Sequence, residues 1–303
     1  MLRGTLMSPE PATTHPTLVL VHGSGAADRK SFIFARALAE AGIPVFAYDK
    51  RGVGESTGDW QAASFEDLAG DVVAAFELLK SRADIDHAAV GMLGVSQAGW
   101  VMPLAALRAP DWAFLISLSG PGVPAAETTI DHAEREMAAS GMPPPAVARV
   151  VGLMKLQYEF ARTGRGWDAY AAARESLAAR MGAPPGSFPG TADDPYFGMI
   201  RRLYFYDPAP TLRQLRVPTL ALFGELDNNV LAEKNRKAWD AALAASGNRD
   251  YTLQVLPRAN HLLLEADVGN NAEMATLKRI VPAYRETVET WLSKRVRGFD
   301  ARD

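Results

Sequence analysis

A short apolar run that leads through a serine-centred turn into a helical stretch constrains this chain more than any other feature. Residues 88–93 have the length of a buried strand, and Gly94-Val95-Ser96-Gln97-Ala98-Gly99 follows directly. Apolar residues at helical spacing come next, from Trp100 to Leu107. A strand, a sharp turn with a central serine and a helix form the layout in which a serine hydroxyl is exposed as a nucleophile.

Such a turn needs small residues two positions before and two positions after the serine, because it brings backbone close to backbone. Gly94 meets this requirement, whereas Ala98 adds one methyl group to the strict G-x-S-x-G pattern. Taken alone, the segment is also compatible with an ordinary serine in a glycine-containing turn.

The composition limits the classes of protein to which the chain can belong. Its 303 residues carry 32 Lys and Arg against 35 Asp and Glu, a net charge of −3 that provides no electrostatic footprint for nucleic acid or anionic membrane. The absence of cysteine excludes disulfides, thiolate metal sites and a cysteine nucleophile. The N-terminus lacks the apolar core of a signal peptide, and no apolar run is long enough to span a membrane. We therefore expect a soluble, cytoplasmic protein with no nucleic-acid or membrane partner; its oligomeric state stays undetermined.

Strand and helix patterns alternate along the first 120 residues. Strands are predicted at residues 2–7, 17–21, 45–48, 88–93 and 114–118, and helices at 31–41, 65–80 and after the serine turn. Ser64 and Asp67 resemble a capping box that opens the second of these helices. The alternation predicts an α/β fold with a mostly parallel sheet and helices on both faces.

The pattern changes between residues 121 and 210, where eleven prolines, many aromatic residues and no strand pattern occur. Helices are predicted at 149–160 and 167–180, with proline-rich linkers at 142–145 and 184–189. We predict a helical cap at 121–210 inserted into a core made of 1–120 and 211–303. The cap's aromatic residues would either shape a pocket for an apolar substrate or form the cap's own core.

The β/α pattern then resumes, with strands predicted at 219–223 and 251–256 and helices at 231–245 and 272–296. Asp227 follows the first of these strands and His261 follows the second, as Ser96 follows residues 88–93. The carboxyl ends of parallel strands meet at one edge of a sheet, so the three side chains are expected to lie together. A serine hydroxyl needs an imidazole to take its proton, and the imidazole needs a carboxylate. The sequence predicts a triad in the order Ser, Asp, His.

Each residue of the predicted triad has a simpler alternative. Asp227 could be a turn residue, and Glu225 in the same loop is a rival carboxylate. His261 could be a surface histidine, and His22, at a strand end before glycine, is expected to pack or shape a loop. Three matching residue types after three strands nevertheless favour the triad.

Attack on a carbonyl also requires donors for the developing oxyanion. The backbone N–H of Gln97, directly after the predicted nucleophile, is one expected donor. The other is the N–H of Ser24, because Gly23 and Gly25 on either side allow the main chain to turn inward. A glycine turn without a ligand is the alternative.

Other chemistries find little support in the sequence. Gly23-Ser24-Gly25-Ala26-Ala27-Asp28 has two of the three glycines of a dinucleotide fingerprint, with Asp28 in place of the third. No Walker A sequence, histidine–carboxylate cluster or zinc-ligand spacing occurs. Serine-triad chemistry needs neither metal nor cofactor, and we expect none.

Five segments together resemble the α/β-hydrolase superfamily, and most closely its bacterial serine esterase and acyl-hydrolase branches. They are HGSGAADR at 22–29, DKRGVGES at 49–56, GVSQAGW at 94–100, GELD at 224–227 and ANH at 259–261. The resemblance covers nearly the whole chain outside the predicted cap. Its departures are the alanine in the serine turn and a short N-terminus that leaves little room for the family's first strands.

The resemblance implies that Ser96 is the nucleophile, His261 the base and Asp227 the acid, with the Ser24 and Gln97 amides as the oxyanion hole. It implies a structural role for the 49–56 loop. The expected function is hydrolysis of carboxylic esters of small to medium acyl substrates through an acyl-enzyme. Alternatives are an amidase or peptidase, a thioesterase, and a non-catalytic homologue that binds a small ligand.

Overall fold

A computed structural model describes residues 1–8, 17–32, 38–39, 42–181 and 187–295. The chain divides into two compact units: Met1–Gly122 together with Pro208–Asp303, and Val123–Asp207. The boundaries predicted from the sequence fall after residues 120 and 210.

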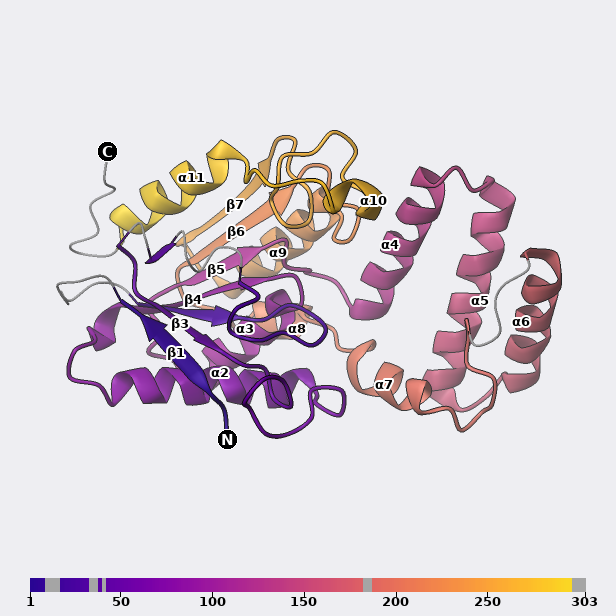
Figure 1. The fold of residues 1–303 in the computed structure, drawn as a ribbon, viewed down its shortest axis with the longest axis horizontal. Helices are drawn as coiled ribbons and strands as arrows, with labels where there is room; N and C mark the ends of the chain where they lie inside the picture. Colours follow the sequence, from indigo (N-terminus) through magenta and orange to yellow (C-terminus); the bar gives the residue numbers. More distant parts are fainter. Residues whose placement is uncertain (9–16, 33–37, 40–41, 182–186, 296–303) are drawn as a thin grey trace. The chain divides into compact units, whose positions relative to one another are not determined.

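A seven-stranded sheet lies at the centre of the first unit (Figure 1). In chain order its strands are β1 (Gly4–Met7), β2 (Thr17–Val21), β3 (Val45–Tyr48), β4 (Val90–Val95), β5 (Leu115–Leu118), β6 (Thr219–Gly224) and β7 (Tyr251–Leu256). Their spatial order is β1-β3-β2-β4-β5-β6-β7, and only β1 runs antiparallel to its neighbour. The carboxyl ends of the six parallel strands therefore share one edge, as the alternating pattern predicted.

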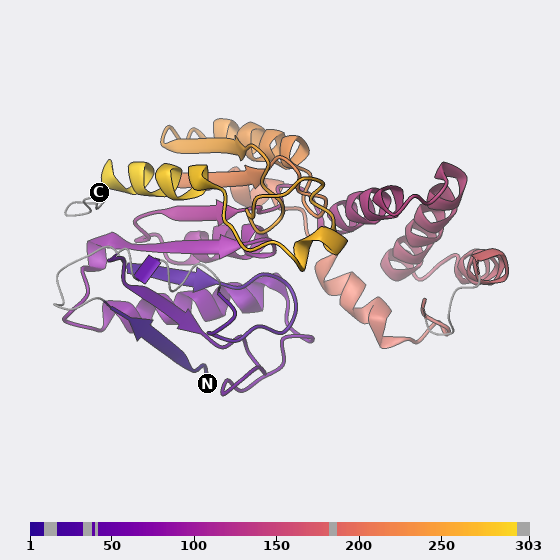
Figure 2. The ribbon, with the colours of Figure 1, turned by 45° about the horizontal axis from the view of Figure 1, so that its top comes forward.

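Helices cover both faces of this sheet (Figures 1 and 2). They are α2 (Phe65–Lys80), α3 (Ala98–Arg108), α9 (Ala232–Ser246) and α11 (Pro282–Ser293). The unit also contains the short helices α8 (Ala209–Leu212) and α10 (Asn271–Met274) and a 3-10 turn at His87–Ala89. On one face, α11 buries Val288 and Leu292 in a cluster with Leu18 and Leu20 of β2. The opposite face packs against α2, α3 and α9. Because β2 is buried on both faces, it is apolar without interruption.

Helix α2 begins and packs as its sequence pattern predicted. The Ser64 side chain accepts a hydrogen bond from the Asp67 amide, and the Asp67 carboxylate accepts one from the Ser64 amide, which completes a capping box. Leu68, Val72 and Leu79 on the predicted apolar face are all buried. Local capping and helical periodicity therefore account for this element.

Two predictions about prolines were wrong. The chain forms two separate helices, α10 and α11, where one helix was expected at 272–296, because Pro282 lacks an N–H and begins a helix at its first turn. Pro144 likewise begins a helix, where residues 142–145 were expected to be a linker. The helix predicted at 31–41 and the linker at 184–189 lie largely outside the described residues.

The second unit is helical throughout its described residues. It contains α4 (Ala125–Ala139), α5 (Pro144–Thr163), α6 (Trp167–Met181) and α7 (Pro195–Leu203). Phe160, Tyr170 and Phe197 are buried, and Phe160 and Tyr170 each meet Phe197 edge to face, so the three form part of a core of the unit's own. Tyr158 and Tyr196 line a cavity of about 850 Å³ within the same unit. The predicted core of aromatic residues is present, whereas a substrate pocket shaped by them stays a prediction.

Candidate active site

Ser96 lies at the turn between β4 and α3, in a left-handed backbone conformation with φ of 57°. Its amide donates to the carbonyl of Leu118 at 2.9 Å, and its carbonyl accepts from the Gly99 amide at 2.8 Å. A residue with a side chain adopts positive φ at a cost, so the flanking strand and helix must hold it. The backbone therefore forms the strained strand-to-helix turn that the sequence pattern predicted around Ser96.

The turn is compact because the start of α3 packs closely on the chain beyond β5. A Cβ atom at Gly99 would lie 2.6 Å from the Cα of Gly120, which is closer than such atoms approach in proteins. Gly99 therefore allows the helix to follow Ser96 without displacing the neighbouring loop.

Asp227 and His261 form a buried pair after β6 and β7. The Nδ1 atom of His261 lies 2.9 Å from Oδ2 of Asp227, and the two side chains are 9% and 0% exposed. An Nδ1–H that donates to the carboxylate leaves the lone pair on Nε2, where the imidazole can accept a proton.

The second carboxylate oxygen of Asp227 is held by the backbone. Oδ1 accepts from the amides of Asn229 at 2.7 Å and Val230 at 2.8 Å. With Oδ1 engaged in this way, Oδ2 is directed to His261, and the carboxylate orients the imidazole.

The loops that carry Asp227 and His261 are joined to each other. The amide of Leu226 donates to the carbonyl of Ala259 at 2.8 Å, and a Cβ atom at Gly224 would lie only 2.3 Å from the carbonyl oxygen of Asn260. The Asn260 side chain accepts from the amides of Leu262 and Leu264, which turns the chain around His261. The contact between Asp227 and His261 is therefore held by two loops that are hydrogen-bonded to each other.

The loop after β2 lies against the serine turn. A Cβ atom at Gly23 would be 3.6 Å from the Cβ of Ser96, so the backbone on the N-terminal side of Ser24 approaches the predicted nucleophile. Gln97 is buried and is the N-cap of α3, where the first amides have no partner within the helix. The two expected oxyanion donors therefore belong to segments on either side of Ser96, and the helix dipole favours negative charge there.

The rival residues in these loops have other contacts. Glu225 accepts a hydrogen bond from the amide of Arg258 at 2.8 Å. His22 is buried, stacks on Phe32 and contacts the carbonyl oxygen of Tyr48 through Nε2. Burial lowers the pKa of His22 to about 4, so it is neutral at pH 7. Both residues have structural contacts of the kind expected for His22.

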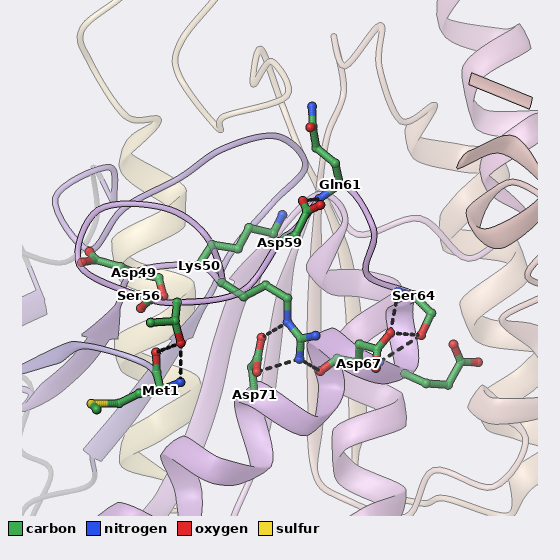
Figure 3. A network of polar contacts seen from close by, with 12 residues as sticks. Met1, Asp49, Lys50, Ser56, Asp59, Gln61, Ser64, Asp67 and Asp71 are labelled. Atoms are coloured by element: carbon green, nitrogen blue, oxygen red, sulfur yellow. Dashed lines mark hydrogen bonds and ion pairs between the residues drawn. The ribbon is translucent and has the colours of Figure 1, made fainter. Parts of the chain in front are cut away.

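The 49–56 loop is a network of buried and half-buried ion pairs. Asp49 pairs with the guanidinium of Arg29 and accepts from the backbone amides of Arg29 and Glu55, each at 2.9 Å. Arg51 forms two hydrogen bonds with Asp71 of α2, at 2.8 and 2.9 Å, in the region that Figure 3 draws. This loop connects the segment after β2 to the rest of the core, in keeping with the structural role that the resemblance implied.

Sequence reasoning gave no separate role to Lys50 within this loop. Its side chain is buried, and its ammonium reaches both the loop after β2 and the Gln97 side chain. The available signal was its position beside Asp49 directly after a buried strand, where a long cation is unusual.

The described residues leave two other kinds of site without support. Within them, no three His, Asp or Glu side chains are grouped so that they could hold a metal ion. The same residues include no helix with the length and apolar character required to cross a bilayer.

Comparisons with known proteins agree with this architecture. The family model of the S33 serine aminopeptidases matches residues 12–159. Esterase EstD of Thermotoga maritima is 26% identical over 286 residues, which cover 92% of this chain and 61% of that protein. The chain therefore spans less than two thirds of the length of this relative.

Solved structures resemble the whole chain. DcsB, solved in complex with its substrate analogue, superposes with a TM-score of 0.61 at 17% identity, over 98% of this chain and 95% of its own. The α/β hydrolase GrgF from Penicillium sp. sh18 gives a TM-score of 0.60 at 17% identity, over 97% and 94%. At these identities the likeness concerns the fold.

Fold, sequence matches and strand order together assign the class. The chain has the α/β-hydrolase fold, and the sequence matches confirm its resemblance to the serine esterase and acyl-hydrolase branches. Esterases and serine aminopeptidases are the members named by the sequence matches.

Proposed function

We propose that this chain is a serine hydrolase that cleaves carboxylic esters of small to medium size. Ser96 is the nucleophile, His261 the general base and acid, and Asp227 the carboxylate that orients His261. The Ser24 and Gln97 amides stabilise the oxyanion. The esterase of Thermotoga maritima among the sequence relatives supports the choice of ester bonds.

One observation carries the proposal. A serine with φ of 57° at the end of β4 lies on the same sheet edge as a buried His–Asp pair that follows β6 and β7. Strain at a serine and burial of a carboxylate beside an imidazole both have a cost, and a protein that only binds a ligand needs neither. Their coincidence at one edge supports nucleophilic catalysis.

The proposed reaction has two halves. His261 Nε2 takes the proton of Ser96 while Oγ attacks the ester carbonyl, and the oxyanion is held by the two amides. Collapse of this intermediate expels the alcohol, which takes the proton from His261 and leaves an acyl group on Ser96. Water then attacks the acyl-enzyme with His261 as base, which releases the acid and restores the serine.

The decisive experiment is labelling of the purified chain with a fluorophosphonate probe, beside Ser96→Ala. We expect an adduct on Ser96, located by peptide mass spectrometry, that is absent from the variant. Turnover of p-nitrophenyl acetate and butyrate should disappear with it. A folded wild-type protein without an adduct would contradict the proposal and favour a non-catalytic ligand-binding role.

The match to the serine aminopeptidase family supports a second candidate, cleavage of an amide next to a free amino terminus. The same triad serves both reactions, so matched substrates must separate them. Alanine p-nitroanilide, a p-nitrophenyl ester and a thioester of one acyl group should be compared by kcat/KM. Preference for the anilide would replace the esterase assignment by the aminopeptidase one.

A further inference from the structure

Lys50 is a buried cation whose contacts all lie around the candidate oxyanion hole. Its Nζ atom donates to the carbonyls of Gly23 at 2.8 Å and Gly25 at 3.1 Å, and to Oε1 of Gln97 at 3.0 Å. An ammonium has three N–H donors, so these three acceptors use all of them. Two belong to the loop after β2, and the third belongs to the residue that follows Ser96.

The contact with Gly23 controls the direction of a specific amide. The carbonyl of Gly23 and the N–H of Ser24 belong to the same peptide unit, and in a trans peptide these groups point in opposite directions. Because Lys50 holds the carbonyl, the Ser24 N–H is directed away from the ammonium. The flanking glycines would otherwise let this peptide rotate, and Gly25 already has φ of 82°.

We propose that Lys50 is a positioning residue for the oxyanion hole, and that its ammonium holds the Gly23–Ser24 peptide and the Gln97 side chain in one arrangement. The catalytic part of this inference rests on the proposed function, since an oxyanion forms only if Ser96 attacks a carbonyl. Lys50 itself touches neither Ser96 nor the substrate in this scheme. Its effect is exerted through the donors that it orients.

The charge of Lys50 is sensitive to alkaline pH. Burial lowers the pKa of its ammonium to about 8, and the carboxylate of Asp71 on α2 acts in the opposite direction. His22 after β2 also interacts electrostatically with Lys50, and Arg51, next in the chain, pairs with the same Asp71 carboxylate. Figure 3 labels Lys50, Asp59 and Asp71 in this region. The ring of Trp60 lies 5.6 Å from Nζ. A neutral amine has only two N–H donors for the three acceptors, and it also loses the charge that strengthens each hydrogen bond.

The test uses the full chain with the variants Lys50→Met and Lys50→Arg. The control is Lys80→Met, which removes the last lysine of α2, a residue paired with Asp111. With p-nitrophenyl butyrate, Lys50→Met should have a kcat lowered by roughly 10- to 100-fold and a nearly unchanged KM. This loss is smaller than the loss of about 10²- to 10³-fold expected when an oxyanion donor itself is removed. Affinity for a trifluoromethyl ketone, which forms an oxyanion on the serine, should fall by a similar factor. Lys80→Met should match the wild type.

The pH profile separates positioning from simple loss of packing. Wild-type kcat/KM should decline above pH 8, whereas Lys50→Met should lack this alkaline limb. Lys50→Arg should recover part of the activity and keep it to higher pH, since a guanidinium stays charged. A loss in Lys50→Met that lies wholly in KM, or that Lys50→Arg does not relieve at any pH, would overturn the positioning role.

Amide hydrogen exchange tests the orientation of the loop without using activity. Protection of residues 22–30, corrected for intrinsic rates, should fall in the wild type between pH 7 and 9.5 and be lost at pH 7 in Lys50→Met. The proposal is overturned if protection is the same in the wild type at pH 7 and 9.5 and also the same in Lys50→Met and the wild type at pH 7. If Lys50→Met does not fold, the comparison of the wild type at the two pH values decides alone. Absence of a Ser96 adduct would reject the esterase assignment separately, and exchange would still judge whether Lys50 holds the loop.

Discussion

The methyl group of Ala98 lies where a side chain at Gly94 would have to be placed. A Cβ atom at position 94 would be 2.4 Å from the Cβ of Ala98 and 3.0 Å from the Cβ of Val21. The alanine that departs from the strict serine-turn pattern is therefore accommodated because the residue four positions earlier is glycine. The two small residues of the turn are coupled.

Gly94→Ala should accordingly destabilise the fold by about 1–3 kcal/mol through overpacking. Ala98→Gly in the same chain should restore part of this loss, and only part, because Val21 remains close. Urea denaturation of the two single variants and the double variant measures the coupling. Strictly additive effects of the two substitutions would show that positions 94 and 98 do not share this space.

Asp227→Asn should lower kcat by roughly 10³- to 10⁴-fold while the protein stays folded. The asparagine oxygen can still accept from Asn229 and Val230, but its NH₂ group would then face Nδ1 of His261. That contact favours the tautomer with hydrogen on Nε2, which cannot accept the serine proton. Glu225→Gln is the matched control, and its kcat in steady-state kinetics should equal that of the wild type. The opposite ranking would transfer the acid role to Glu225.

Asp49→Ala should reduce the free energy of unfolding by about 1–2 kcal/mol, because the half-buried amides of Arg29 and Glu55 lose their acceptor. Activity should fall as well, since this carboxylate also anchors the loop that carries Ser24. Asp84→Ala, at an exposed ion pair with Arg82, serves as the control and should leave the denaturation midpoint unchanged. Equal midpoints for all three proteins would mean that the Asp49 network adds no stability.

The buried His22 should make stability depend on pH below neutrality. Its pKa is about 4 in the folded protein against 6.5 for a free histidine, so the unfolded chain binds the extra proton first. Stability is therefore lost as pH falls from about 6.5 to 4, by roughly 3 kcal/mol in total, and this term is constant below pH 4. His22→Gln should show a shallower decline over this interval in urea titrations. Parallel curves for wild type and variant would exclude His22 as the source.

Much of the core could be predicted because its signals are local. The uninterrupted apolar run of β2, the capping box at Ser64 and the spacing of α2 each act within a few residues, so they specify the same element in any fold that contains them. The positions of Ser96, Asp227 and His261 after three strands could likewise be predicted, because parallel strands bring their carboxyl ends to one edge of a sheet.

The helix starts at Pro282 and Pro144 were missed for a local reason, because a proline is compatible both with the first turn of a helix and with a linker. The sequence alone also could not decide features that depend on distant partners. Lys50 in sequence is one more charge in a polar loop. Its three acceptors come from segments 25 to 47 positions away, which only the folded sheet brings together.

The sequence by itself determined the fold class of this protein, because hydrophobic periodicity, turn residues and the positions of the three candidate catalytic side chains after strands are properties of short segments. Tertiary structure decided how those side chains are held: Asp227 on two amides and His261, Gly94 against Ala98, and Lys50 between the loop after β2 and Gln97. These contacts join residues far apart in the chain, and their geometry exists only after the sheet has set the positions of its loops.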